Sequence, residues 1–182
     1  MRTPAPPYAN EGPHALWHVS ENPSIERFAP HVSATSELDE PLVWAIDTRH
    51  LPLYWFPRDC PRGTFWAGAA SDPNDAARLL AGSSRVHAIE DGWPDRMRTT
   101  QVFAYRLPEP PFEPHPDVGG YWLSRATVQP AEVCPLGDLV SLHEDAGIEL
   151  RVLENLWPLW NDVIASTLEF SGMRLRNARP AE

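Results

Sequence analysis

The sequence contains no lysine, and all 15 of its basic residues are arginine. Without lysine there can be no Schiff-base or phosphate-loop lysine, which excludes pyridoxal enzymes and ordinary P-loop nucleotide hydrolases. The formal net charge of −10 disfavours general nucleic-acid binding, because that binding depends on neutralising phosphates. A local group of arginines could still bind one small anionic molecule.

Cysteine is also scarce. Cys60 and Cys134 lie too far apart for a metal knuckle, and one pair in 182 residues is not a disulfide framework. The sequence has no dinucleotide glycine fingerprint and no G-x-S-x-G nucleophile elbow. It shows neither a secretory leader nor an apolar run of membrane-spanning length. We therefore expect a cytoplasmic protein with reduced thiols, and its oligomeric state stays open.

The seven histidines are scattered, so no metal site is predicted. His14 and His18 have the spacing of two ligands on one helical face, but they fall where a strand is expected. His143 has no second histidine four residues away. Tryptophan, by contrast, is abundant: 8 residues are available to fill a core or to line a pocket.

Alternation and short apolar runs predict more strands than helices. Strands are expected at residues 15–20, 42–46, 63–67, 84–90, 101–108 and 148–154, with a strand pair or bent ribbon over 121–137. Helical segments are expected at residues 23–28, 53–56, 71–82 and 138–147, and from a cap at Asn155 with an apolar stripe reaching Leu168. Several strands follow one another directly. The pattern is typical of an α+β fold with a mainly antiparallel or mixed sheet and short flanking helices.

The expected organisation is one α+β domain over residues 14–182. The opening residues 1–13 are rich in Pro, Ala and Gly, which predicts a flexible N-terminal segment. The sequence of residues 14–182 contains no internal repeat.

The stretch YWFPRDCPRGTFW, residues 54–66, places charge among aromatic residues. Arg58, Asp59 and Arg62 lie in a loop bracketed by two prolines. One interpretation is structural, since arginines satisfy carbonyl oxygens and Asp59 can pair locally. The other is an anion clamp, in which Arg58 and Arg62 hold a phosphate or carboxylate beside stacking aromatic rings. Cys60, between prolines and aromatic residues, is more typical of a buried thiol than of a nucleophile.

His18 stands near the end of the first predicted strand, and alternation puts it on the same face as Ser20. A histidine there could be a core residue bonded to a backbone carbonyl. Alternatively, it could donate a hydrogen bond to a ribose or carbonyl oxygen at the end of the strand.

Four segments, LWHVSENPSIERFAP, PLVWAID, PRDCPR and LWPLWNDVIASTLEFSGMRLRNA, resemble an uncharacterised bacterial family, a domain of unknown function (DUF6886). PRDCP is the most distinctive of these pieces, and the resemblance runs from about His14 to near the end of the chain. Membership of that family implies no activity.

The order of elements also resembles the ADP-ribosyltransferase-like fold, through the His-x-Ser strand, VWAI and YWLSRATVQPAEV. That resemblance implies catalytic roles for His18 and Ser20, with His18 on the NAD ribose, and an aromatic stack on nicotinamide from Trp44 or Tyr54. The third-motif glutamate of that fold has no clear counterpart, because Tyr121 opens the corresponding strand and Glu132 comes later.

The leading hypothesis is therefore a domain that binds NAD or another phosphorylated nucleotide, with transfer of ADP-ribose as the activity that the resemblance implies. Its cofactor-binding residues would be Trp44, Tyr54, Arg58, Asp59 and Arg62. The alternative is a non-enzymatic domain that binds a protein or a small ligand and whose Arg-Asp-Cys-Pro-Arg loop is structural.

Overall fold

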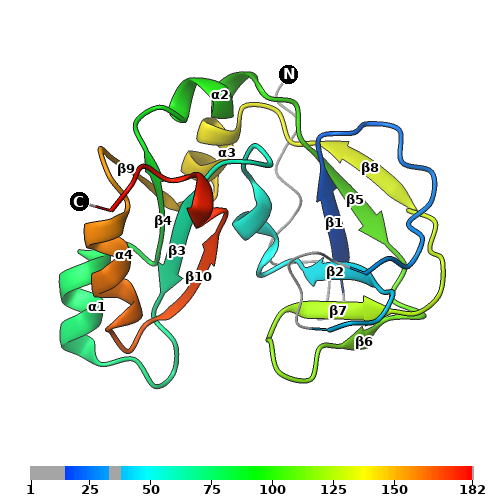
Figure 1. Cartoon of the computed structure of the whole chain (residues 1–182), viewed down its shortest axis with the longest axis horizontal. Helices are drawn as coiled ribbons and strands as arrows, with labels where there is room; N and C mark the ends of the chain where they lie inside the picture. The colour runs from blue at the N-terminus through cyan, green and yellow to red at the C-terminus, as the bar shows by residue number, and fades with distance from the viewer. Residues whose placement is uncertain (1–14, 33–37, 182) are drawn as a thin grey trace. The chain divides into compact units, whose positions relative to one another are not determined.

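The computed structural model describes residues 15–32 and 38–181 (Figure 1). The chain divides into two compact units, each assembled from two separate segments. Unit 1 consists of Met1–Trp55 and Gln101–Gly137, and unit 2 of Phe56–Thr100 and Asp138–Glu182. The single domain expected from the sequence stays a prediction, and the segment predicted to be flexible lies outside the described residues.

Unit 1 contains a six-stranded sheet in which every neighbouring pair of strands is antiparallel. The strand order is β6-β7-β2-β1-β5-β8. In chain order the elements are β1 Leu16–Ser20, β2 Val43–Asp47, the 3₁₀ helix η1 Leu51–Tyr54, β5 Phe103–Leu107, β6 Glu113–Pro114, β7 Tyr121–Ser124 and β8 Glu132–Pro135. The first two strands confirm the expected ones almost residue for residue.

One face of the unit 1 sheet carries an apolar core. It is built from Leu16, Phe28, Val43, Ala45, Tyr105, Leu107, Phe112 and Val128. Because side chains alternate along a strand, His18 and Ser20 share this face with Leu16. Trp17 and its partner Ile46 project to the opposite face.

Unit 2 contains a four-stranded sheet of order β10-β3-β4-β9. It is mixed, since β4 and β9 are parallel while the other two pairs are antiparallel. Its elements are β3 Arg62–Trp66, α1 Pro73–Leu80, β4 Arg85–Glu90, α2 Pro94–Thr99, α3 Leu139–Asp145, β9 Glu149–Leu153, α4 Trp157–Ile164, β10 Glu169–Met173 and the 3₁₀ helix η2 Leu175–Asn177. The predicted α+β class with mainly antiparallel pairing is confirmed.

Helices α1 and α4 lie side by side against one face of the unit 2 sheet (Figure 1). Their apolar side chains pack on that face with Phe65, Val86, Ala88 and Leu168; the helical members are Leu79, Leu80 and Val163, with Leu156 just before α4. The indole of Trp160 lies over two glycines that are cross-strand neighbours, Gly63 on β3 and Gly172 on β10. Only residues without a side chain leave room for a ring this close to the strands.

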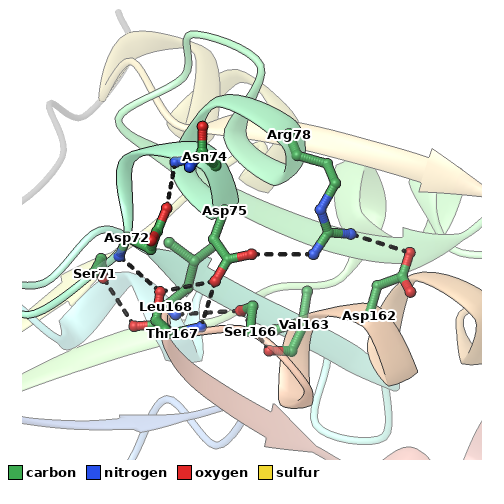
Figure 2. Close-up of polar contacts among 10 residues, drawn as sticks. All are labelled: Ser71, Asp72, Asn74, Asp75, Arg78, Asp162, Val163, Ser166, Thr167 and Leu168. Atoms are coloured by element: carbon green, nitrogen blue, oxygen red, sulfur yellow. Dashed lines mark hydrogen bonds and ion pairs between the residues drawn. The ribbon is translucent and has the colours of Figure 1, made fainter.

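A polar network ties the start of α1 to the turn between α4 and β10 (Figure 2). Asp72 caps α1 by accepting the backbone N–H of Asn74 at 2.7 Å. The Asp75 carboxylate accepts both the backbone N–H and the hydroxyl of Thr167, at 2.9 and 2.8 Å. Ser71 donates its hydroxyl to the Thr167 carbonyl at 3.0 Å. These bonds fix where β10 begins.

Several expected elements differ from the structure. The ribbon predicted over 121–137 is two strands that do not pair with each other and lie in opposite halves of the sheet, since β7 pairs with β2 and β8 with β5. No helix forms at residues 23–28, where Phe28 instead bridges Val128. The last helix ends at Ile164, not near Leu168, because the chain turns there into β10, a strand the sequence analysis missed. Helix α2 was missed as well.

Candidate functional site

The face of the unit 2 sheet opposite α1 and α4 carries polar and charged side chains beside the buried Ile89, the register partner of Arg62. Strand register places five of its side chains together on the two central strands: Arg62, Thr64, Trp66, Arg85 and His87. All five are buried. We call this set the polar face. Burial of polar and charged groups costs free energy, and clusters of such groups often mark functional sites, so the polar face is the candidate functional site.

The two arginines are held in fixed positions. Arg62, 4% exposed, donates to the Cys60 carbonyl at 3.0 Å and to the Met173 sulfur at 2.9 Å, and its guanidinium lies 4.9 Å from the centre of the Phe56 ring. Arg85, 6% exposed, lies 4.7 Å above the Trp66 indole. Both arginines therefore place positive charge against an aromatic surface.

His87 on β4 meets His143 of α3 on this face. Nδ1 of His87 lies 2.9 Å from Nε2 of His143, and both rings are fully buried. Nδ1 of His143 lies 2.7 Å from the Leu139 carbonyl, which can only accept, so this nitrogen carries the proton. His143 Nε2 then accepts from His87 Nδ1–H. This leaves His87 Nε2 as a lone pair, and no polar atom of residues 15–32 or 38–181 lies within hydrogen-bonding distance of it.

Both histidines are neutral at physiological pH. Burial, together with the charges of His143, Arg85 and Arg62, holds the pKa of His87 well below its ordinary value. Burial lowers the pKa of His143 to about 4, against the opposing effect of its hydrogen bond to Leu139. The pair is therefore a chain of neutral imidazoles with a defined direction, from the carbonyl of α3 to the lone pair of His87.

Cys60 is fully buried before β3, and its neighbourhood does not activate it. Burial raises the pKa of its thiol to about 12, although Arg62 and Arg96 act in the other direction. The interpretation of Cys60 as a buried thiol is consistent with this geometry.

The proline-bracketed loop is a tight turn, closed by a hydrogen bond from Cys60 N–H to the Pro57 carbonyl at 3.0 Å. Arg58 and Asp59 are exposed at its tip. Their carbonyl oxygens accept hydrogen bonds from side chains near η2: Arg174 binds the Arg58 carbonyl at 3.1 Å, and Asn177 binds the Asp59 carbonyl at 2.8 Å. Of the three charged residues predicted in this loop, only Arg62 belongs to the polar face.

The predicted catalytic residues His18 and Ser20 are in unit 1. Nδ1 of His18 lies 3.2 Å from the Trp44 carbonyl and its ring centre lies 4.6 Å from that of Phe28. Ser20 accepts the backbone N–H of Asn22 at 3.1 Å. The roles of both residues in catalysis stay predictions.

The predicted stacking residues Trp44 and Tyr54 do come together, around Tyr121. The hydroxyl groups of Tyr54 and Tyr121 are 2.9 Å apart, and the Trp44 ring lies edge-on to Tyr121 at 6.1 Å and near His115 at 5.6 Å. The Trp44 side chain, however, projects from the sheet face opposite that of His18.

Glu132, the acidic residue considered as a third-motif counterpart, opens β8 at an edge of the unit 1 sheet. Its register partner is Arg106, whose own partner is Trp17. Glu132 therefore projects from the face of Trp17, opposite that of His18. The two groups that an ADP-ribosyl transfer site would bring together lie on different faces of one sheet.

Sequence reasoning did not select Arg85, His87 or His143 as site residues. A signal was present for the first two, since residues 85–88 alternate polar and apolar as a strand with one polar face requires. Nothing local to the sequence indicated that His143, 56 residues further along, bonds to His87.

The fold and the polar face define an α+β protein with a preformed, positively charged and histidine-containing sheet face. The chain belongs to the family of unknown function DUF6886, whose sequence model matches residues 17–178, and the expected membership is thereby confirmed. In comparisons with curated proteins and with solved structures, no match to the chain was found. No helix in the described part of the chain is long and apolar enough to cross a membrane. The described residues also contain no group of three potential metal ligands.

Proposed function

We propose that the protein binds a small phosphorylated anion at the polar face, and that a nucleotide of the NAD type is the first ligand to test. The observation that carries the proposal is the placement of two arginines and a directed histidine pair on one face of a four-stranded sheet whose other face is an ordinary apolar core. Guanidinium groups match phosphate oxygens in shape and charge, which makes arginine the usual residue for such ligands.

The aromatic partners of the arginines support the same ligand class. Trp66 and Phe56 hold the guanidinium planes in place, so little side-chain freedom remains to be lost on binding. Trp66 is itself anchored by its indole N–H, which donates to Glu169 on β10. A rigid, buried pair of arginines of this kind favours a compact anion over a flexible acidic peptide.

The direct test is the melting temperature of the protein with millimolar NAD, and with ADP-ribose in parallel. A ligand present at a hundred times its Kd stabilises the folded state by about 2.7 kcal/mol, which a thermal scan detects readily. Arg85→Gln should abolish the shift, whereas Arg125→Gln, which breaks an exposed ion pair with Glu40, should leave it unchanged. A wild-type protein whose melting temperature does not respond to either compound would contradict the proposal.

A second candidate is the non-enzymatic domain in which the Arg58–Arg62 turn is structural. The side chains of Arg174 and Asn177 donate hydrogen bonds to the carbonyls of Arg58 and Asp59, and these bonds favour a structural role for the tip of the loop. Under this proposal Arg58→Gln leaves anion binding intact, whereas Asn177→Ala lowers stability. Under the clamp hypothesis Arg58→Gln would itself abolish binding.

ADP-ribosyl transfer is the activity to assay if NAD binds. The measurement is release of nicotinamide from NAD by the wild-type protein and by His18→Ala. Because His18 and Glu132 project from opposite sheet faces, we expect no release above background. Turnover that is lost in His18→Ala would restore the transferase hypothesis.

A further inference from the structure

Nε2 of His87 is a buried acceptor without a hydrogen-bond donor in the described part of the chain. A fully buried acceptor with no hydrogen bond is costly and is rare in folded proteins, so each instance has a specific cause. The other tautomer of His87 would not meet this requirement, because its Nε2–H would then be a buried donor without a partner, and it would also need His143 to donate a proton from Nε2. The carbonyl of Leu139 prevents this, because it fixes the His143 proton on Nδ1.

We propose that His87 Nε2 accepts a hydrogen bond from a hydroxyl group of the ligand that the polar face holds, so that the ligand class is a hydroxyl-bearing phosphate such as a sugar phosphate. This inference rests on the proposed function and narrows it. The arginines would hold the anionic group, and His87 would select the ligands that carry a hydrogen-bond donor. His143 is a positioning residue that fixes the tautomer of His87.

Nε2 of His87 acts as a hydrogen-bond acceptor and not as a general base. A base must become an imidazolium, and the groups around it oppose that charge: His143 on α3, Arg62 on β3 and Arg85 on β4. Burial acts in the same direction. His87 therefore stays neutral through the pH range in which exposed histidines titrate, and it accepts the hydrogen bond from the ligand without changing its own charge.

Two substitutions separate the two nitrogens of His87. In His87→Asn the shorter amide reaches the level of Nδ1, so the donor to His143 is kept and the Nε2 acceptor is lost. In His87→Gln the longer amide reaches the level of Nε2, so an acceptor toward the ligand is kept and the bond to His143 is lost. Ribose 5-phosphate and sulfate are the probes, since sulfate is an anion without a hydroxyl group.

The expected result is that His87→Asn weakens the binding of ribose 5-phosphate about tenfold, the factor that one ordinary hydrogen bond supplies, and leaves sulfate binding unchanged. His87→Gln should retain most of the affinity for ribose 5-phosphate. Equal losses for both probes, or no loss for either, would overturn the inference while the proposed function stands. If neither probe binds the wild-type protein, the proposed function fails and the inference fails with it.

Imidazole ¹⁵N spectra of the wild-type protein give a test that does not depend on either variant folding. Both histidines should carry their proton on Nδ1 in the free protein. Addition of ribose 5-phosphate should shift the Nε2 resonance of His87, and sulfate should not. A free protein with the His87 proton on Nε2, or a His87 resonance indifferent to ribose 5-phosphate under saturating conditions, would contradict the inference.

Discussion

The contact between Trp160 and its two glycines gives the sharpest prediction about stability. A Cβ added to Gly63 would lie 2.8 Å from Cε3 of Trp160, and one added to Gly172 would lie 2.6 Å from Cζ2. Such separations essentially never occur, so the indole must move by about 0.6 Å to reach ordinary contact with an alanine at position 63. The ring is confined between α4 and the sheet, so the movement disturbs the core that α4 makes with α1.

We expect Gly63→Ala to lower the free energy of unfolding by about 1–3 kcal/mol, the usual cost of overpacking a core. Chemical denaturation followed by tryptophan fluorescence and circular dichroism measures it. The matched control is Gly92→Ala, where an added Cβ meets nothing within 4 Å and the change should be close to neutral.

A double-mutant cycle with Trp160→Leu tests the cause. If the steric contact is responsible, Gly63→Ala should cost almost nothing in the Trp160→Leu background, and the coupling energy should equal most of the single-variant cost. The same cost in both backgrounds would refute the reasoning, because the loss would then come from the strand itself and not from the indole.

Three further predictions concern pH, thiol reactivity and the network in Figure 2. The pKa of His143 is near 6.5 in the unfolded chain and about 4 in the folded protein, so its contribution to stability is complete above pH 6.5 and is lost as the pH falls toward 4. From this residue the unfolding free energy measured in urea should be about 2 kcal/mol lower at pH 5 than at pH 8, and His143→Gln should remove this share while the share of His87, whose pKa is also lowered, remains. In the native protein a thiol reagent should label Cys134 and spare Cys60, with both labelled after denaturation; labelling of both at one rate in the native state would show that Cys60 is not buried. Asp75→Asn and Thr167→Val should each lower the melting temperature by a few degrees, and the double variant should be little worse than either. The hydrogen bonds from Thr167 lower the pKa of Asp75, so this contribution to stability is present above pH 3.8 and is lost as the pH falls below it. Additive losses in the double variant would show that the two residues act separately.

Local signals in the sequence predicted much of the secondary structure. The helical segment predicted at residues 71–82 contains α1, and the apolar run at residues 42–46 marked β2. Alternation at residues 84–90 marked β4. These elements depend on neighbours within one or two turns of chain, which is the information that a single sequence carries.

The elements that were missed depend on distant partners. Residues 169–173 form a strand only because β3 offers its edge, more than a hundred residues earlier in the chain. β7 and β8 look like a hairpin in sequence, yet each pairs with a different inner strand. Helix α2 is short, and its buried Met97 is the only apolar position that ties it to the core.

The residues of the candidate site also fall into those that local sequence predicted and those that depend on distant partners. Arg62 was predicted from its local setting and lies on the polar face, whereas Arg58 and Asp59 from the same loop are exposed at the tip of a turn. The histidine pair joins β4 to α3 and could not have been found from spacing. Which side chains share a face follows from register, and register follows from the whole sheet.

The interleaving of the two units has a consequence for synthesis. A nascent chain that has emerged as far as Gly137 holds every segment of unit 1 but only Phe56–Thr100 of unit 2. At that stage β3 and β4 can form their antiparallel pair, but β9 and β10, which flank them, have not yet emerged. Both outer edges of this strand pair therefore stay unpaired until the rest of the chain emerges, and unpaired strand edges are the sites at which incompletely folded chains aggregate.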